Sequence, residues 1–332
     1  MTIINNIEID NIIYNKNIIK ECLKNNLPLE DKLNVIIVIS NPCLYIRRYI
    51  LMKEFINRIL LEEEFVNLFI VELIYNNQKF IITESKNKNH LQLKTNVPLW
   101  HKENLINLGV KYLLPKNYKA FAWIDADIEF ENSSWALDTL KILNGTKDIV
   151  QLFSHAVDMD YNRKTMNIFN SAGYCYCKEM SYISSGKDNW HPGFCYAITK
   201  TAYEKLGGLY EFAILGSGDT IMMLSLLNRG LNAINELSTN DYKESILLFQ
   251  ENAKHLRFGY TPGVIRHHFH GKKINRKYGE RWKILLNHNY SPKEHIKKDS
   301  KGILIPTDKF SDELKDNIMQ YFKERNEDEF YN

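Results

Sequence analysis

The sequence has little cysteine, no strong net charge and no long apolar run. Its cysteines number five, and no Cys-x-x-Cys spacing occurs, which argues against a disulfide framework or a zinc ribbon and fits a reducing compartment. A net charge of +3 over 332 residues gives no strong case for nucleic acid as a partner. The longest apolar stretch, at 65–75, is interrupted by Asn67 and Glu72 and is too short to cross a bilayer.

The N-terminus has neither the basic start nor the continuous apolar segment of a signal peptide. We therefore expect a cytoplasmic protein without a transmembrane segment, and leave contact with a membrane surface open. Apolar residues make up 44% of the chain and aromatic residues 12%, which is typical of a globular protein with a large core.

Apolar runs alternate with helical patterns along the chain. The β-branched run at 34–39 predicts a strand covered on both faces, and a helix at 44–63 and a strand at 69–74 follow it, which indicates a parallel βαβ start. Residues 158–190 show no period, and we expect an irregular binding or lid element there, although Cys175 and Cys177 would share one face of a strand. We predict further strands at 90–93, 120–124, 149–153, 194–198 and 264–268, and further helices at 99–114, 133–143, 200–206, 220–227, 241–256, 278–286 and 312–325.

Two carboxylates follow the apolar run 120–124. Asp125 and Asp127 are expected at the C-terminal end of a buried strand, in an extended segment that continues through 128–131. This edge of an open α/β sheet is where ligands bind, and Mg²⁺ or Mn²⁺ is commonly held by one or two carboxylates together with substrate phosphates. An Asp-x-Asp pair is also compatible with a solvated strand end.

A glycine-rich turn at 216–218 leads to Asp219 at the start of a predicted helix. A carboxylate there is suited to accept a proton from an attacking hydroxyl group. The competing interpretation is an ordinary aspartate cap of that helix.

Three histidines occur within four positions near the end of the strand predicted at 264–268. In an extended strand His268 and His270 would share a face and His267 would point the other way. At least one imidazole could complete a metal site begun by Asp127, which would favour Mn²⁺ because nitrogen joins the oxygen ligands. Which of the three binds is left open, and a structural polar cluster is the alternative.

Taken together, these segments resemble GT-A glycosyltransferases of the family-2-like group, including sugar transferases of bacteria and large viruses. The resemblance spans roughly 34–286. Its motifs are the Asp-x-Asp segment at 123–130, the acceptor-side segments at 190–194, 206–210 and 216–219, and the His-x-x-His-Gly ending at 267–271 followed by 275–278. One departure is that Gly218 stands where the acceptor motif usually has glutamate before the aspartate.

The resemblance implies roles for individual residues. Asp219 would be the general base of an inverting transfer, and Trp190, His191 and Gly218 would lie on the acceptor side. The metal, Mn²⁺ or Mg²⁺, would be held by Asp125, Asp127 and His270. The implied donor-binding residues are Pro42, Glu72, Lys102, Asn104, Asp125 and Asp127.

The resemblance also implies a fold and an activity. We expect an α/β, Rossmann-like GT-A domain at 34–275 with a mixed, mostly parallel sheet, an N-terminal arm at 1–33 and a C-terminal helical extension at 276–332. The activity would be transfer of a hexose from a nucleotide-sugar, with a UDP-sugar as the expected donor, to a hydroxyl group of a glycan, glycoprotein or glycolipid. The alternatives are a metal-dependent phosphohydrolase and a non-catalytic carbohydrate-binding protein.

Overall fold

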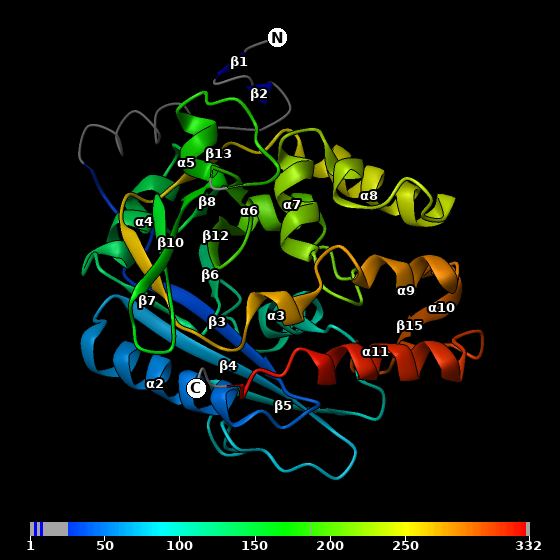
Figure 1. The fold of residues 1–332 in the computed structure, drawn as a ribbon. Helices are drawn as coiled ribbons and strands as arrows, with labels where there is room; N and C mark the ends of the chain where they lie inside the picture. The colour runs from blue at the N-terminus through cyan, green and yellow to red at the C-terminus, as the bar shows by residue number, and fades with distance from the viewer. Residues whose placement is uncertain (1–2, 5–6, 9–25, 187, 330–332) are drawn as a thin grey trace.

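The structure is a computed structural model that describes residues 3–4, 7–8, 26–186 and 188–329 (Figure 1). Much of the arm expected at 1–33 therefore lies outside the described residues. Its described strands, β1 (Ile3–Ile4) and β2 (Ile7–Glu8), form an antiparallel pair.

A seven-stranded sheet forms the centre of the molecule. Its strands, in order across the sheet, are β13 (Phe258–Tyr260), β8 (Ile149–Gln151), β12 (Cys195–Thr199), β6 (Ala120–Ile124), β3 (Leu33–Ser40), β4 (Val66–Tyr75) and β5 (His90–Thr95). Strand β12 is antiparallel to both of its neighbours, whereas β3, β4, β5 and β6 are mutually parallel and β13 is parallel to β8. The expected α/β fold with a mixed, mostly parallel sheet is confirmed.

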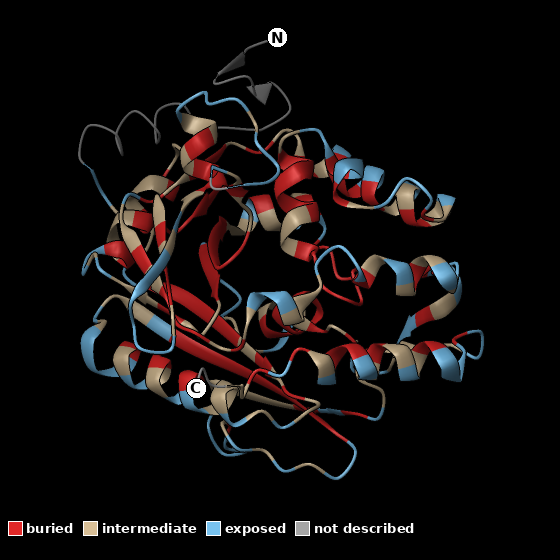
Figure 2. Cartoon of the chain, in the orientation of Figure 1, coloured by how far each residue is buried: buried red, intermediate tan, exposed pale blue. Residues whose placement is uncertain are grey.

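Helices cover both faces of this sheet because its central strands are apolar on both sides (Figure 2). Val35 and Ile37 of β3 belong to one core together with α2 (Ile46–Glu62) and α4 (Trp135–Leu143). Ile36 faces the opposite core, where α3 (Lys102–Tyr112) packs. Each of these fully buried aliphatic side chains contributes about 2 kcal/mol to folding.

A second, five-stranded sheet lies beside the first and was not expected. Its strands, in order, are β11 (Trp190–His191), β10 (Thr165–Ser171), β9 (His155–Met159), β14 (Val264–His267) and β7 (Ile128–Phe130). The prediction that 158–190 is irregular was thus wrong over 165–177, because β10 and α5 (Ala172–Cys177) occupy that span. Cys175 and Cys177 accordingly lie in a helix rather than on one face of a strand.

The remaining elements are mostly helical. Among the described residues, three helices and a short hairpin lie after 276, and the domain boundary expected there remains a prediction. No described helix is long and apolar enough to span a membrane. These elements are α6 (Lys200–Leu206), α7 (Gly218–Leu226), η1 (Gly230–Ala233), α8 (Asn240–Ala253), η2 (Lys273–Arg276), α9 (Arg281–Asn287), α10 (Pro292–His295), β15 (Ile296–Lys298), β16 (Leu304–Pro306) and α11 (Asp312–Glu324).

Candidate active site

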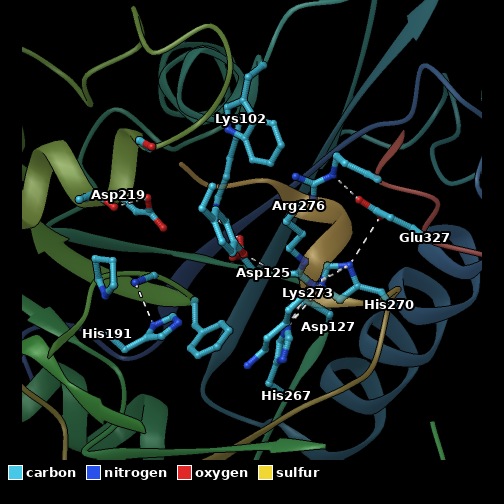
Figure 3. Close-up of a pocket in the computed structure, with 18 of the residues that line it drawn as sticks. Lys102, Asp125, Asp127, His191, Asp219, His267, His270, Lys273, Arg276 and Glu327 are labelled. Atoms are coloured by element: carbon cyan, nitrogen blue, oxygen red, sulfur yellow. Dashed lines mark hydrogen bonds and ion pairs between the residues drawn. The ribbon is translucent and has the colours of Figure 1, made fainter. Parts of the chain in front are cut away.

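A cavity of about 800 Å³ opens at the C-terminal ends of β3 and β6. Segments far apart in sequence line it, including the turns after these two strands, the start of α7, the end of β14 and the C-terminal segment near Glu327. Figure 3 shows Asp219 and His191 on one side of the cavity and Asp127, His267 and His270 on the other. The topology therefore places the cavity at the sheet edge where ligands bind in open α/β folds.

The Asp-x-Asp segment is a turn that joins the two sheets. Asp125 N donates to Phe194 O at 2.9 Å, and His268 N donates to Asp127 O at 2.7 Å. Strand β6 belongs to the large sheet and β7 to the small one, so the extended segment expected through 125–131 is interrupted by this turn. The turn aims the two carboxylates at different neighbours.

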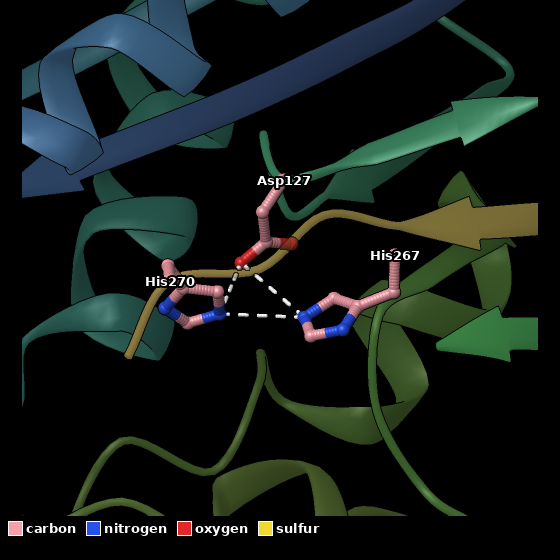
Figure 4. A group of neighbouring side chains, drawn as sticks. All are labelled: Asp127, His267 and His270. Carbon is pink, nitrogen blue, oxygen red and sulfur yellow. Dashed lines mark hydrogen bonds and ion pairs between the residues drawn. The ribbon is translucent and has the colours of Figure 1, made fainter. Parts of the chain in front are cut away.

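Asp127 lies with His267 and His270, and the ligand atoms of the three residues fall within 4.8 Å of one another (Figure 4). His270 Nε2 lies 2.9 Å from Asp127 Oδ2, and His267 Nε2 lies 3.8 Å from the same oxygen. Burial raises the pKa of Asp127, but His270 and His267 outweigh burial and hold it below its usual range. Asp127 is therefore ionised, as a metal ligand must be.

His268 does not join this group. Strand β14 ends at His267, so the strand alternation does not extend to 270, and His268 Nε2 lies 3.2 Å from Glu129 Oε2 instead. The expectation that His268 and His270 share a face was therefore wrong, and His267 takes the place beside His270.

Asp158 holds His267 in the orientation that metal binding needs. His267 Nδ1 donates to Asp158 Oδ1 at 2.6 Å, and the other oxygen of Asp158 lies 2.6 Å from Lys273 Nζ. Because Nδ1 carries the proton, the lone pair of Nε2 faces Asp127 and His270. Burial also lowers the pKa of His267, which favours the neutral imidazole.

A further observation indicates that Asp127, His267 and His270 suit a divalent ion. Asp127 Oδ1 is buried and has no hydrogen-bond partner among the described residues, which is costly for a carboxylate unless a cation satisfies it. Arg276 Nη2 lies 2.8 Å from His270 Nε2, so an ion bound to this nitrogen would take the place of the guanidinium group. One carboxylate and two imidazoles suit Mn²⁺ and other transition ions better than Mg²⁺.

Asp125 is not part of this group. Its carboxylate lies 2.5 Å from Lys102 Nζ, at the start of α3. Burial raises the pKa of Asp125 to about 6, and the Lys102 ammonium opposes that rise. Ligation by Asp125, expected from the Asp-x-Asp motif, thus remains a prediction, while its pairing with Lys102 places a cation at the centre of the cavity.

Asp219 lies in the first turn of α7 and lines the cavity opposite the histidines. Its Oδ1 accepts a hydrogen bond from Thr220 N at 2.8 Å. A Cβ atom added at Gly193 would lie 2.7 Å from Asp219 Oδ2, so the glycine there makes room for the carboxylate. His191 is next to this position, and burial lowers its pKa to about 3, which keeps the imidazole neutral.

The other predicted residues divide into two groups. Pro42 and Trp190 line the cavity, as do Lys102 and His191. Glu72, Asn104 and Gly218 are not among the lining residues. The Glu72 carboxylate accepts hydrogen bonds from the backbone amides of 81–83, and the Asn104 amide donates to Glu211 at 2.7 Å, so both side chains hold the fold together.

Several further cavity residues were not assigned to the site from the sequence. Arg276 and Lys273 lie in a basic stretch of the sequence, which was a signal for phosphate contacts. Glu103, Asp158 and Glu327 carried no local motif. Glu327 is 2% exposed, pairs with Arg48 and Arg325, and lies 3.6 Å from His270 Nδ1, so the C-terminal segment forms part of the site wall.

Comparison with known proteins finds a likeness among solved structures. No family model and no curated protein sequence matches the chain. Among solved structures, the catalytic domain of Drosophila beta1,4-galactosyltransferase 7, crystallised with xylobiose, covers 84% of this chain and 93% of its own at 12% identity and a TM-score of 0.37. A likeness of this extent carries no argument by itself, so the case for function rests on the cavity residues.

Proposed function

We propose that the protein is a metal-dependent glycosyltransferase of the GT-A type, which transfers a hexose from a nucleotide-sugar, most simply a UDP-sugar, to an acceptor hydroxyl with inversion. The observation that carries this proposal is the layout of one cavity. The metal-capable group of Asp127, His267 and His270 faces Asp219 across it, and basic side chains lie between and around them.

The basic side chains suit the diphosphate of the donor. Lys102, Lys273 and Arg276 line the cavity together with Arg281. Arginine and lysine are the usual protein partners of phosphate oxygens. A divalent ion bound at Asp127 would neutralise charge on the departing diphosphate.

Asp219 suits the acceptor side of the reaction. In an inverting transfer the acceptor oxygen forms a bond to the anomeric carbon while the bond from that carbon to the diphosphate oxygen breaks. The electron pair of the broken bond leaves with the diphosphate, and the hydroxyl proton passes to Asp219. Asp219 Oδ2 lies beside Gly193, where the absence of a side chain gives it access to the cavity.

A panel of nucleotide-sugars tests this proposal. Each donor is incubated with the protein and Mn²⁺ or Mg²⁺, with and without a mixture of glycosides, and free nucleotide and new glycosides are measured by mass spectrometry. We expect metal-dependent nucleotide release from one donor class and formation of a β-linked product from an α-linked donor.

Other results would contradict the proposal. Release of phosphate from simple phosphate esters would identify a phosphohydrolase, and nucleotide binding without any release would identify a non-catalytic carbohydrate-binding protein. Retained anomeric configuration would remove the inverting mechanism. The single metal-capable group found among the described residues already disfavours a two-metal hydrolase.

A further inference from the structure

Glu103 brings a second carboxyl group to the Asp219 side of the cavity. It is the second residue of α3, it is 7% exposed, and it lines the cavity. A Cβ atom added at Gly218 would lie 2.5 Å from both Cδ and Oε1 of Glu103. The carboxyl group of Glu103 thus fills the space that a side chain at 218 would take.

Gly218 is required for space rather than for backbone conformation. Its φ lies outside the left-handed region, unlike that of Gly216 at 91°. An ordinary residue would therefore fit the backbone at 218 if Glu103 were absent. Glu103 and Asp219 both line the cavity, and the two carboxyl groups lie close enough for the charge of Asp219 to act on Glu103.

The surroundings of Glu103 favour its protonated form. Burial is the main cause that raises its pKa to about 8; Asp219 and Asp125 add to the rise, and Lys102 opposes it. A protonated carboxyl group can both donate and accept a hydrogen bond, which matches the two roles of a sugar hydroxyl. Asp219 as carboxylate can only accept.

We propose that Glu103 binds the acceptor hydroxyl next to the one that Asp219 deprotonates, so that the site selects acceptors with neighbouring hydroxyl groups, as in a pyranose. This rests on the proposed glycosyl transfer. Glu103 would be an acceptor-positioning residue, and its loss would weaken acceptor binding and leave nucleotide binding intact.

Binding of simple glycosides tests the role of Glu103 without turnover. Methyl β-xyloside, β-glucoside and β-galactoside are titrated by saturation-transfer NMR in the presence of UDP and Mg²⁺. We expect Glu103→Ala to weaken the best glycoside about tenfold or more, the scale of a lost hydrogen bond to a buried group, and Glu103→Gln to weaken it less. Glu211→Gln, which alters another buried carboxylate near α3, serves as the control and should bind normally.

Monodeoxy glycosides locate the contact. In wild type, removal of one hydroxyl should cost about as much as Glu103→Ala, and in the Glu103→Ala variant the same removal should cost little more. Equal binding by wild type and both Glu103 variants, a parallel loss of UDP binding, or no glycoside binding by wild type would overturn the proposal. Absence of nucleotide release from every donor would instead contradict the proposed function.

A transplanted carboxyl group gives a second test. Gly218→Glu alone should impair glycoside binding because its side chain collides with Glu103. The double variant Glu103→Ala with Gly218→Glu removes the collision and returns a carboxyl group close to that space, two bonds beyond the Cβ position. We expect it to recover most of the glycoside affinity lost in Glu103→Ala, and a double variant no better than Glu103→Ala would contradict the assignment.

Discussion

The two sides of the cavity both carry buried carboxyl groups, but in opposite electrostatic settings. On the metal-capable side, Asp127 lies among His267, His270 and Arg276, and these groups hold its pKa below the usual range against the effect of burial. On the other side, burial is the main cause that raises the pKa of Glu103 to about 8, with Asp219 adding to the rise and Lys102 opposing it. The same functional group is thus prepared to bind a cation on one side and to hold a proton on the other.

The difference follows from which elements meet at each side. The end of β14 and the turn after β6 bring imidazoles to Asp127, so its negative charge is compensated. The starts of α3 and α7 bring two acids together with Lys102 as the adjacent cation, so one of the acids keeps its proton. Substitutions on each side should therefore have separable effects on metal and donor binding and on acceptor chemistry.

The largest effect is expected on the metal-capable side. Asp127→Ala removes the carboxylate shared by both imidazoles and should abolish transfer and the thermal stabilisation given by UDP with Mn²⁺. In wild type, ligand at a hundred times its Kd stabilises by about 2.7 kcal/mol. A thermal shift titration measures this, with His268→Ala as the control that should respond like wild type. An equal shift in Asp127→Ala and wild type would remove Asp127 from the metal shell.

On the other side, Asp219→Asn should reduce the transfer rate by about a hundredfold or more, the scale of a lost general base. Because Asp219 acts on the acceptor, UDP-sugar affinity measured by calorimetry should stay near normal. Full activity of the variant would leave Asp219 as a residue of the first turn of α7 with no part in the chemistry.

The central sheet and the order of the motifs could be predicted from sequence because their signals are local. The continuous apolar runs at 34–39 and 120–124 predict buried strands. Asp127 follows the second of these strands, and Asp219 follows a glycine-rich turn. In the second sheet, β7 and β14 lie in segments that were predicted as extended, but β10 gave no such signal, since only its last residue is buried.

The site residues that the sequence did not assign are brought to the cavity by tertiary contacts. Which histidines join Asp127 was left open from the sequence, and His267 lies beside His270 because the strand ends at His267, an end that nothing in the sequence marks. Glu103 sits within an ordinary helical pattern, and its place in the cavity wall follows from how the start of α3 packs against the start of α7. Asp158 becomes a partner of His267 through the pairing of β9 with β14.

Asp158→Asn tests whether the two sides of the cavity are separable. It removes the carboxylate that orients His267 but leaves all three candidate metal ligands in place. Loss of the carboxylate that orients His267 should lower Mn²⁺ affinity about tenfold to a hundredfold. Competition with a fluorescent chelator measures this directly, without turnover. Glycoside binding at the Asp219 side should not change, and if it falls in parallel with metal affinity, the two sides are not separable.

Glu103→Gln should make folding less dependent on pH. The folded pKa is raised to about 8 from an ordinary value of 4.5, so between these values the folded state holds a proton that the unfolded state has released. Stability contributed by this site therefore falls as pH rises from about 5 to 8, by an amount on the order of a few kcal/mol. Denaturant unfolding of wild type and Glu103→Gln at pH 5 and 8 should show the variant gaining relative stability at pH 8. A constant difference would mean that Glu103 titrates normally.

The smallest effect is expected from Asp328, which joins the C-terminal segment to α2. Its carboxylate accepts hydrogen bonds from Ile46 N at 2.9 Å and Arg47 N at 2.8 Å, whereas the N-cap residue Tyr45 provides no side-chain cap. Asp328→Ala should cost about 1 kcal/mol, as other lost caps do. The melting temperature should then fall by about 2 °C, and Asp308→Ala, at an exposed loop position, should leave it unchanged.

The same variant tests which side of the cavity depends on the C-terminal segment. Glu327, the preceding residue, pairs with Arg48 and lies 3.6 Å from His270 Nδ1, so loosening of this segment reaches the metal-capable side first. We therefore expect Asp328→Ala to weaken Mn²⁺ binding severalfold and to leave glycoside binding unchanged. If glycoside binding weakens as much as Mn²⁺ binding, the C-terminal segment supports both sides of the cavity. The two sides would then differ in their electrostatic setting but not in their dependence on this segment.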